Sequence, residues 1–184
     1  MEELRREPTE SVEIRDLDGE AREAAVPILI DSFVGIYRWH AKRTLRRVSL
    51  VRGAEVRGEL RAVAMLERLV PGVGYVYYIA VAAAHRREGL GRLLLEDALT
   101  RFREEGLRIV YAAAEEDNAA SIALFGAQGF RRIERDETSY LEGGLGAKGL
   151  RTRMMLVSGE ILLGRTLDPS TDPLLRRNDS PPNP

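Results

Sequence analysis

The sequence contains no cysteine in 184 residues. That absence excludes disulfides, thiolate metal ligands and a cysteine nucleophile. Histidine is almost as scarce, because only His40 and His85 are present and neither belongs to a cluster of carboxylates. We therefore expect no metal site. The net charge of −1 lacks the basic excess that is typical of non-specific nucleic-acid-binding proteins, so no nucleic-acid partner is expected.

Long hydrophobic runs are also missing. The most apolar stretch, residues 75–84, is far shorter than the roughly 20 residues that span a bilayer. Residues 1–10 are charged and lack the apolar core of a signal peptide. The sequence therefore predicts a cytoplasmic location without membrane association.

The pattern of residues predicts one domain over residues 11–164. A flexible N-terminus at 1–10 precedes it, and a disordered tail at 165–184, which holds five of the eight prolines, follows it. Apolar alternation predicts strands at 11–17, 48–52, 60–69, 74–81, 107–114, 130–140 and 151–157. Helical spacing predicts helices at 20–33, 37–47, 90–105 and 118–128, with Pro27 breaking the first. Glycine and proline at 53–59 and 70–74 predict hairpin turns there.

This order of elements predicts an α/β fold. We expect a mixed, mainly antiparallel sheet of six to seven strands, flanked by about four helices. The helix at 90–105 is expected to cross over between the strands at 74–81 and 107–114. The composition agrees with a single packed domain, since 44% of the residues are hydrophobic and 31% are charged.

Two glycines, Gly89 and Gly91, begin the helix at 90–105. Three arginines accompany them: Arg86, Arg87 and Arg92. The first N–H groups of a helix have no intrahelical acceptor, and they carry the positive end of the helix dipole. Positions without a side chain let an anion approach that backbone closely, so the loop is predicted to bind phosphate. The P-loop pattern is absent, and Leu94 occupies the third glycine position of the dinucleotide-binding pattern.

What remains is Arg86-x-x-Gly89-x-Gly91, four residues after the strand end Ala80-Val81. This arrangement resembles the acetyl-coenzyme A signature of the GCN5-related N-acetyltransferase (GNAT) superfamily. Residues 117–130 resemble the second motif of that family. The matching positions there are Asn118, Ser121, Leu124, Phe125, Gly129 and Phe130. The resemblance covers residues 11–157, with specific residues only in 75–130.

The resemblance implies that acetyl-CoA is the acetyl donor, with its pyrophosphate on backbone N–H groups of the glycine loop. The strand at 79–81 would bind the pantetheine arm as an added strand would. The implied acetyl-CoA-binding residues are Ile79, Ala80, Val81, Arg86, Arg87, Glu88, Gly89, Leu90, Gly91, Arg92, Asn118, Ser121 and Phe125. Asn118 fits a plain helix N-cap equally well. Many family members have tyrosine at the position of Phe125, where it protonates the leaving thiolate, so the general acid stays open.

The general base and the acceptor site are less specific in this sequence. Family members often place the base on the strand before the signature, where the candidate catalytic residue is Tyr75. The carboxylates of Glu115 and Glu116 remain alternatives. The implied acceptor-binding residues are Phe33, Tyr37, Trp39 and Tyr140. For each aromatic residue, packing in the core is the competing interpretation.

The implied function is transfer of the acetyl group of acetyl-CoA to a primary amine by direct attack on the thioester. The acceptor would be a small molecule, a peptide or a protein N-terminus, and the acidic balance mildly favours a cationic one. A non-catalytic acetyl-CoA sensor is the alternative, because Phe125 has no proton to give and no carboxylate lies on the strand before the signature. A homodimer is left open.

Overall fold

The computed structural model describes residues 11–134, 153–156 and 158–168. Across these ranges, seven strands form one sheet in the order β1-β2-β3-β4-β5-β7-β6. The strands are β1 (Val12–Asp16), β2 (Leu50–Val56), β3 (Glu59–Val70), β4 (Val73–Val81), β5 (Ile109–Glu115), β6 (Arg131–Arg132) and β7 (Glu160–Thr166). Neighbouring strands pair antiparallel except for β4 and β5, which are parallel. The predicted mixed, mainly antiparallel sheet is confirmed.

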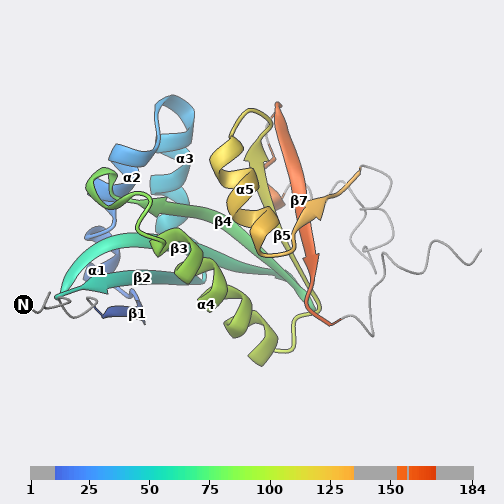
Figure 1. The fold of residues 1–184 in the computed structure, drawn as a ribbon, viewed down its shortest axis with the longest axis horizontal. Coiled ribbons are helices and arrows are strands. Elements are labelled where there is room, and N and C mark those ends of the chain that lie inside the picture. The colour runs from blue at the N-terminus through green and yellow to red at the C-terminus, as the bar shows by residue number, and fades with distance from the viewer. Residues whose placement is uncertain (1–10, 135–152, 157, 169–184) are drawn as a thin grey trace, which may run out of the picture.

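Helices cover both faces of this sheet (Figure 1). They are α1 (Glu20–Glu23), α2 (Val26–Ser32), α3 (Gly35–Leu45), α4 (Leu90–Glu104) and α5 (Ala119–Ala127), with a 3₁₀ turn, η1 (Ala83–His85), before α4. Pro27 lies in the first turn of α2, where its missing N–H costs nothing, so the predicted break falls between α1 and α2. Among the described helices, none combines the length and apolar character that a bilayer crossing requires.

The helix α4 contributes most of the helical side chains that pack against one face of the sheet. Its buried residues repeat at helical spacing and are Leu90, Leu94, Leu95, Ala98, Leu99 and Phe102. They pack against small and branched residues of β2, β3, β4 and β5, and Phe125 of α5 joins them. On the other face, α2 and α3 pack against Val51, Val63 and Met65. The sheet is therefore buried on both sides along its middle strands.

The predicted turn at 53–59 is wrong in extent, because β2 continues to Val56. The reversal is made by Arg57 and Gly58 alone, with φ of 54° and 76°. Two successive positive φ values are the signature of a type I′ hairpin turn. Gly53 belongs to β2, where it pairs with Val63 of β3, and an added Cβ would lie 2.6 Å from Leu60 Cδ1.

The end of the domain differs from the prediction. The expected strand at 151–157 is wrong, because Arg153 and Met154 are helical, and the closing strand is β7, which the sequence pattern did not reveal. Within residues 130–134 of the expected strand at 130–140, only β6 is a strand; residues 135–140 lie outside the described residues, as do 1–10 and 169–184. The strand β7 extends beyond residue 164, the predicted end of the domain.

Two adjacent leucines of α4 test this account of the core. Leu94 is 0% exposed, whereas Leu93 is 37% exposed. We expect Leu94→Ala to lower the free energy of unfolding by about 3 kcal/mol, because the substitution leaves a cavity. Leu93→Ala should lower it by less than about 1 kcal/mol. Urea unfolding of both variants measures the difference, and equal losses would contradict the packing described for α4.

Candidate functional site

The site begins where β4 and β5 separate. The two strands pair only between Val73–Val76 and Ile109–Ala112. Beyond these pairs, β4 runs to Val81 along β3, and β5 runs to Glu115 along β7. Tyr77 is an extra residue opposite β3, since Met65 pairs with Tyr78 and Leu66 with Val76. This β-bulge lies at the point of separation, where it bends the strand. The sheet is therefore open in its middle (Figure 1).

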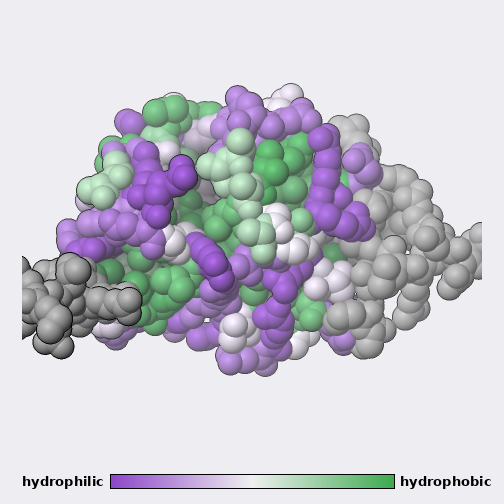
Figure 2. Space-filling view, in the orientation of Figure 1, coloured by the Kyte–Doolittle hydropathy of each residue, from purple (hydrophilic) through white to green (hydrophobic). Residues whose placement is uncertain are grey.

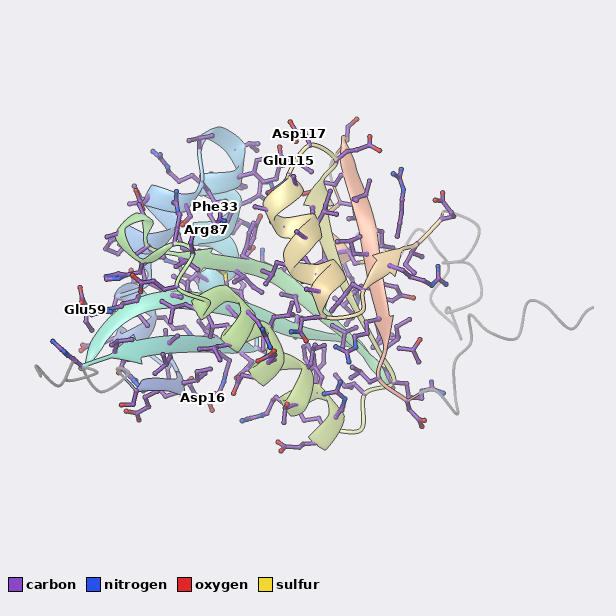
Figure 3. The ribbon with its side chains drawn as sticks, in the orientation of Figure 1. Asp16, Phe33, Glu59, Arg87, Glu115 and Asp117 are labelled. Carbon is purple, nitrogen blue, oxygen red and sulfur yellow. The ribbon has the colours of Figure 1, made fainter. Side chains whose placement is uncertain are left out.

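A cavity of about 220 Å³ occupies this opening, and we call it the central pocket. Its walls come from β4, β5, β7, α3, α5, residues 154–155 and the segment that joins α2 to α3. Predicted site residues that line it are Phe33, Tyr37, Tyr75, Ile79, Asn118, Ser121 and Phe125. Figure 3 shows Phe33 and Glu115 on opposite sides of the opening. Figure 2 shows apolar surface over α5 and the opening beside it, between hydrophilic flanks.

The free edge of β4 presents backbone polar groups to the opening. Ala82 donates its N–H to Arg61 O of β3 at 2.9 Å. Because hydrogen-bonding direction alternates along an antiparallel strand, Ile79 and Val81 face the other edge and Ala80 faces β3. The carbonyl of Val81 agrees with this, since it accepts hydrogen bonds from Ser32 Oγ and Arg86 Nε, both at 3.3 Å. Ile79 and Val81 thus stand where a ligand could add as a strand.

The glycine loop lies at the same end of β4. Gly89 caps α4 with φ +87°, and Arg87 also has a positive φ of 72°. The first intrahelical bond runs from Leu93 N to Gly89 O at 3.1 Å, so residues 90–92 have no intrahelical acceptor for their N–H groups. A Cβ on Gly91 would sit at 3.7 Å from atoms of β4 and α5, an ordinary contact. Packing alone therefore does not require glycine at 91, whereas close approach of an anion to the backbone does.

The three arginines of the loop differ in their surroundings. Arg86 donates to Asp31 O at 3.3 Å and pairs with the Asp31 carboxylate at 3.6 Å, which ties the loop to α2. Arg92 pairs with Glu96 at 2.8 Å, one turn along α4. Arg87 forms no ion pair or side-chain hydrogen bond with any described residue. Of the three, Arg87 has its charge most available to a ligand.

The second predicted motif forms the wall on the α5 side. Asn118 Oδ1 accepts a hydrogen bond from Ser121 N at 3.0 Å, which confirms it as the N-cap of α5. Phe125 is 6% exposed, and its ring meets that of Phe130 edge-on at 5.0 Å. Phe125 thus contributes an apolar surface to the pocket while it anchors α5 in the core.

Three tyrosines of β4 line the central pocket, and burial is the main influence on the pKa of each. Burial raises the pKa of Tyr75 well above its usual value, and it raises the pKa of Tyr78 to about 12 with help from the charge of Glu160. Tyr77 donates its hydroxyl to Arg153 O, and its pKa is also raised, chiefly by burial. All three are therefore neutral phenols near pH 7. Tyr75 can donate a hydrogen bond or orient water, but it is not ionised to act as a base.

Two carboxylates face these tyrosines. Glu115 and Glu160 are directly opposite each other in β5 and β7, and both line the central pocket. From α3, Tyr37 reaches the same place: its pKa is raised by burial first, then by the charges of both carboxylates and by hydrogen bonding to them. Sequence reasoning missed Glu160, because β7 was not expected. The sequence signal for β7 was the apolar run Ile161–Leu163 after Gly159.

Some predicted residues lie elsewhere. Trp39 does not line the pocket; it is 56% exposed, with its ring against His40 and under the guanidinium of Arg43. Glu116 pairs with Arg132 at 2.9 Å outside the pocket, which separates it from Glu115 as a candidate base. Tyr140 lies outside the described residues. Within those residues, no group of three or more potential ligands is placed to hold a metal ion.

Comparison with known proteins agrees with this geometry. A family model described as "Acetyltransferase (GNAT) family" matches residues 11–130. Mycothiol acetyltransferase of Rhodococcus opacus is 36% identical over 66 residues, which are 36% of this chain and 22% of that protein. Mycothiol acetyltransferase of Amycolatopsis mediterranei is 41% identical over 64 residues, 35% of this chain and 21% of that protein. The chain spans about a fifth of the length of these curated relatives.

Solved structures share the whole fold at lower sequence identity. The ribosomal-protein-S18-alanine N-acetyltransferase of Escherichia coli superposes with a TM-score of 0.64 at 21% identity, over 86% of this chain and 95% of that chain. The PaiA N-acetyltransferase of Thermoplasma acidophilum, solved in complex with coenzyme A, superposes with a TM-score of 0.63 at 13% identity, over 85% of this chain and 99% of that chain. These likenesses establish the fold.

Gly89 provides a test of the anion site, with Gly58 as a matched control. Both have positive φ, 87° and 76°, and both have open space where a Cβ would stand. Gly89→Asp places a negative charge at the start of α4, so we expect coenzyme A to bind at least about tenfold more weakly, a loss of about 1.4 kcal/mol. Gly58→Asp has the same backbone strain in the β2–β3 turn and should leave affinity unchanged. Calorimetry measures both, and equal affinity of the two variants would refute the assignment.

Proposed function

The chain belongs to the acetyltransferase (GNAT) family, and we propose that it transfers the acetyl group of acetyl-CoA to a primary amine. One observation carries the proposal. Where β4 separates from β5, the opening extends from the start of α4, which is suited to bind phosphate, to a pocket lined by two carboxylates. The donor would approach along the free edge of β4 and the acceptor from the side of Tyr37 and Glu160. This arrangement brings an acyl donor and a cationic nucleophile to one place.

On the donor side, the proposal assigns the pyrophosphate to the N–H groups at the start of α4, near Arg87. The backbone groups of Ile79 and Val81 would bind the pantetheine arm as an added strand. A backbone N–H on this edge would also polarise the thioester carbonyl and stabilise the oxyanion that forms on it. Arg86 would act indirectly, since it fixes the loop against Asp31.

On the acceptor side, the paired carboxylates are the main support. Like charges directly opposite in a sheet are destabilising. A cationic amine between Glu115 and Glu160 would relieve that repulsion, and Tyr37 would complete the polar contacts from α3. The central pocket is otherwise lined mainly by aromatic and apolar side chains. The site therefore favours an ammonium group at its acidic end.

The proposed reaction needs a base before it needs an acid. Glu160 would take a proton from the ammonium, and the amine nitrogen would then bond to the acetyl carbon while the carbon–sulfur bond breaks; the second proton of the nitrogen would pass to the departing sulfur or to water. Sulfur leaves as a thiolate, whose modest basicity (thiol pKa about 8.5) permits departure without a donor at the position of Phe125. Tyr75 would orient water or the amine as a neutral phenol.

The alternative of a non-catalytic sensor drew on the lack of a carboxylate near the predicted base. Glu115 and Glu160 lining the pocket remove that support. A cytoplasmic location and the absence of a nucleic-acid partner stay predictions from the sequence, and a homodimer stays open. Thiol release from acetyl-CoA across a panel of amines and peptides tests turnover directly, and tight donor binding without release from any acceptor would favour the sensor.

The identity of the base can be tested with three variants. We expect Glu160→Gln to lower kcat/KM by about 10²-fold, because it removes the proton acceptor, and to abolish the acidic limb of the pH profile. Tyr75→Phe keeps the ring, so it should lower kcat/KM less and leave that limb in place. Glu116→Gln makes the same substitution at a carboxylate outside the pocket and should match the wild type.

The reverse pattern would contradict this assignment. If Tyr75→Phe loses about 10²-fold while Glu160→Gln retains wild-type kcat/KM and its pH limb, the phenol takes the proton. Calorimetry with coenzyme A should give the same affinity for all three variants, which separates loss of chemistry from loss of donor binding.

A further inference from the structure

A second cavity of about 270 Å³ opens beside the central pocket, and we call it the arginine pocket. Thr44, Tyr77 and Met155 line both cavities, so the two are neighbours with a common wall. Three cationic side chains line the arginine pocket: Arg43, Arg47 and Arg153. Its chemistry is therefore opposite to that of the carboxylates across the wall.

Among the described residues that line the arginine pocket, the one carboxylate does not neutralise these cations. Glu67 Oε2 accepts a hydrogen bond from Ser49 N at 3.0 Å, and its Oε1 accepts one from Arg68 N at 3.1 Å. Both oxygens are thus held by backbone N–H groups. The three arginines and Glu67 together carry a formal charge of +2.

Among the described residues, Arg43 and Arg153 are held by contacts other than ion pairs. Arg43 lies over the Trp39 ring, 5.5 Å from its centre, which is a cation–π contact and not an ion pair. Arg153 donates to Leu69 O, and its own carbonyl accepts the Tyr77 hydroxyl. Among the described residues, no carboxylate forms an ion pair with Arg43 or Arg47, whereas their neighbour Arg46 pairs with Glu23 at 3.6 Å.

The end of a helix explains only part of this cluster. Cations stabilise helix C-termini, and Arg43 lies in the last turn of α3. Arg153, however, reaches the same cavity from a segment more than a hundred residues away in the chain. Guanidinium groups that converge from separate segments present the N–H donors that carboxylates and phosphates require.

We propose that the arginine pocket binds an anionic group, a carboxylate or a phosphate, carried by the acceptor whose amine lies at Glu115 and Glu160. This inference rests on the proposed function and narrows its substrate class to amines that carry an anion on a spacer. The spacer would run past Thr44, Tyr77 and Met155, the residues that line both cavities. Aliphatic amines without an anion would use only half of the site.

The first experiment titrates inorganic phosphate into protein saturated with coenzyme A, so that the start of α4 is already occupied. We expect binding to the wild type and at least about tenfold weaker binding to Arg47→Ala and to the Arg43→Ala, Arg47→Ala double variant. Arg46→Ala removes the adjacent cation of the same helix end and should bind as the wild type does. No binding to the wild type, or an equal loss in Arg46→Ala, would overturn the proposal.

The second experiment compares ω-amino acids of increasing length with n-alkylamines of the same length as acceptors. We expect kcat/KM to favour one length of amino acid by about tenfold over its matched amine, and Arg47→Ala to abolish that preference. Phosphate should compete with this amino acid; binding without competition would mark a separate anion site and overturn the assignment. Acetylation of both series without preference would overturn this inference alone, whereas no acetylation of any amine would count against the proposed function.

Discussion

The short pairing of β4 with β5 is the constraint on which the rest of the site depends. Only four residue pairs join the two strands, and then each follows its other neighbour. If the pairing continued to the ends of the strands, the polar groups of Ile79 and Val81 would bond to β5 and the central pocket would close. The sheet instead gives up several internal hydrogen bonds, and the free edge is left for a ligand to complete.

The helix α4 connects this opening to the stability of the whole domain. Its apolar side forms much of the core on one face, while its first turn offers N–H groups at the mouth of the opening. A ligand held there would stabilise the same helix that holds the core together, so binding and folding share one element. Two arginines of the loop have different roles. Arg86 fixes the loop to α2, whereas the charge of Arg87 stays available to a ligand.

The sequence predicted the elements around the glycine loop well and the C-terminal part of the domain poorly. Residues 74–130 contain long, strongly periodic segments with clear caps, of which Asn118 is one. In contrast, the run Met154–Val157 is apolar without a distinguishing period, so it fits a strand or a helix equally. The true closing strand contains Gly164, a residue that usually weakens strands. Here it is favoured because an added Cβ would lie 2.8 Å from Ile133. Such a tertiary contact is invisible in the sequence, and Glu160 was missed with the strand that carries it.

The bulge at Tyr77 fixes which residues of β4 direct their backbone polar groups toward each edge of the strand. Side chains and backbone polar groups alternate with a period of two, so the extra residue decides that Ile79 and Val81, rather than Tyr78 and Ala80, present their backbone to the opening. Insertion or deletion of one residue between the bulge and η1 would exchange these roles and turn the backbone polar groups of the residues now at 79 and 81 toward β3. Length changes in this part of the chain are therefore compatible with the site only in steps of two. The hairpin turn at Arg57 and Gly58 has no such restriction on its length, which makes it the safer place to graft or extend the chain.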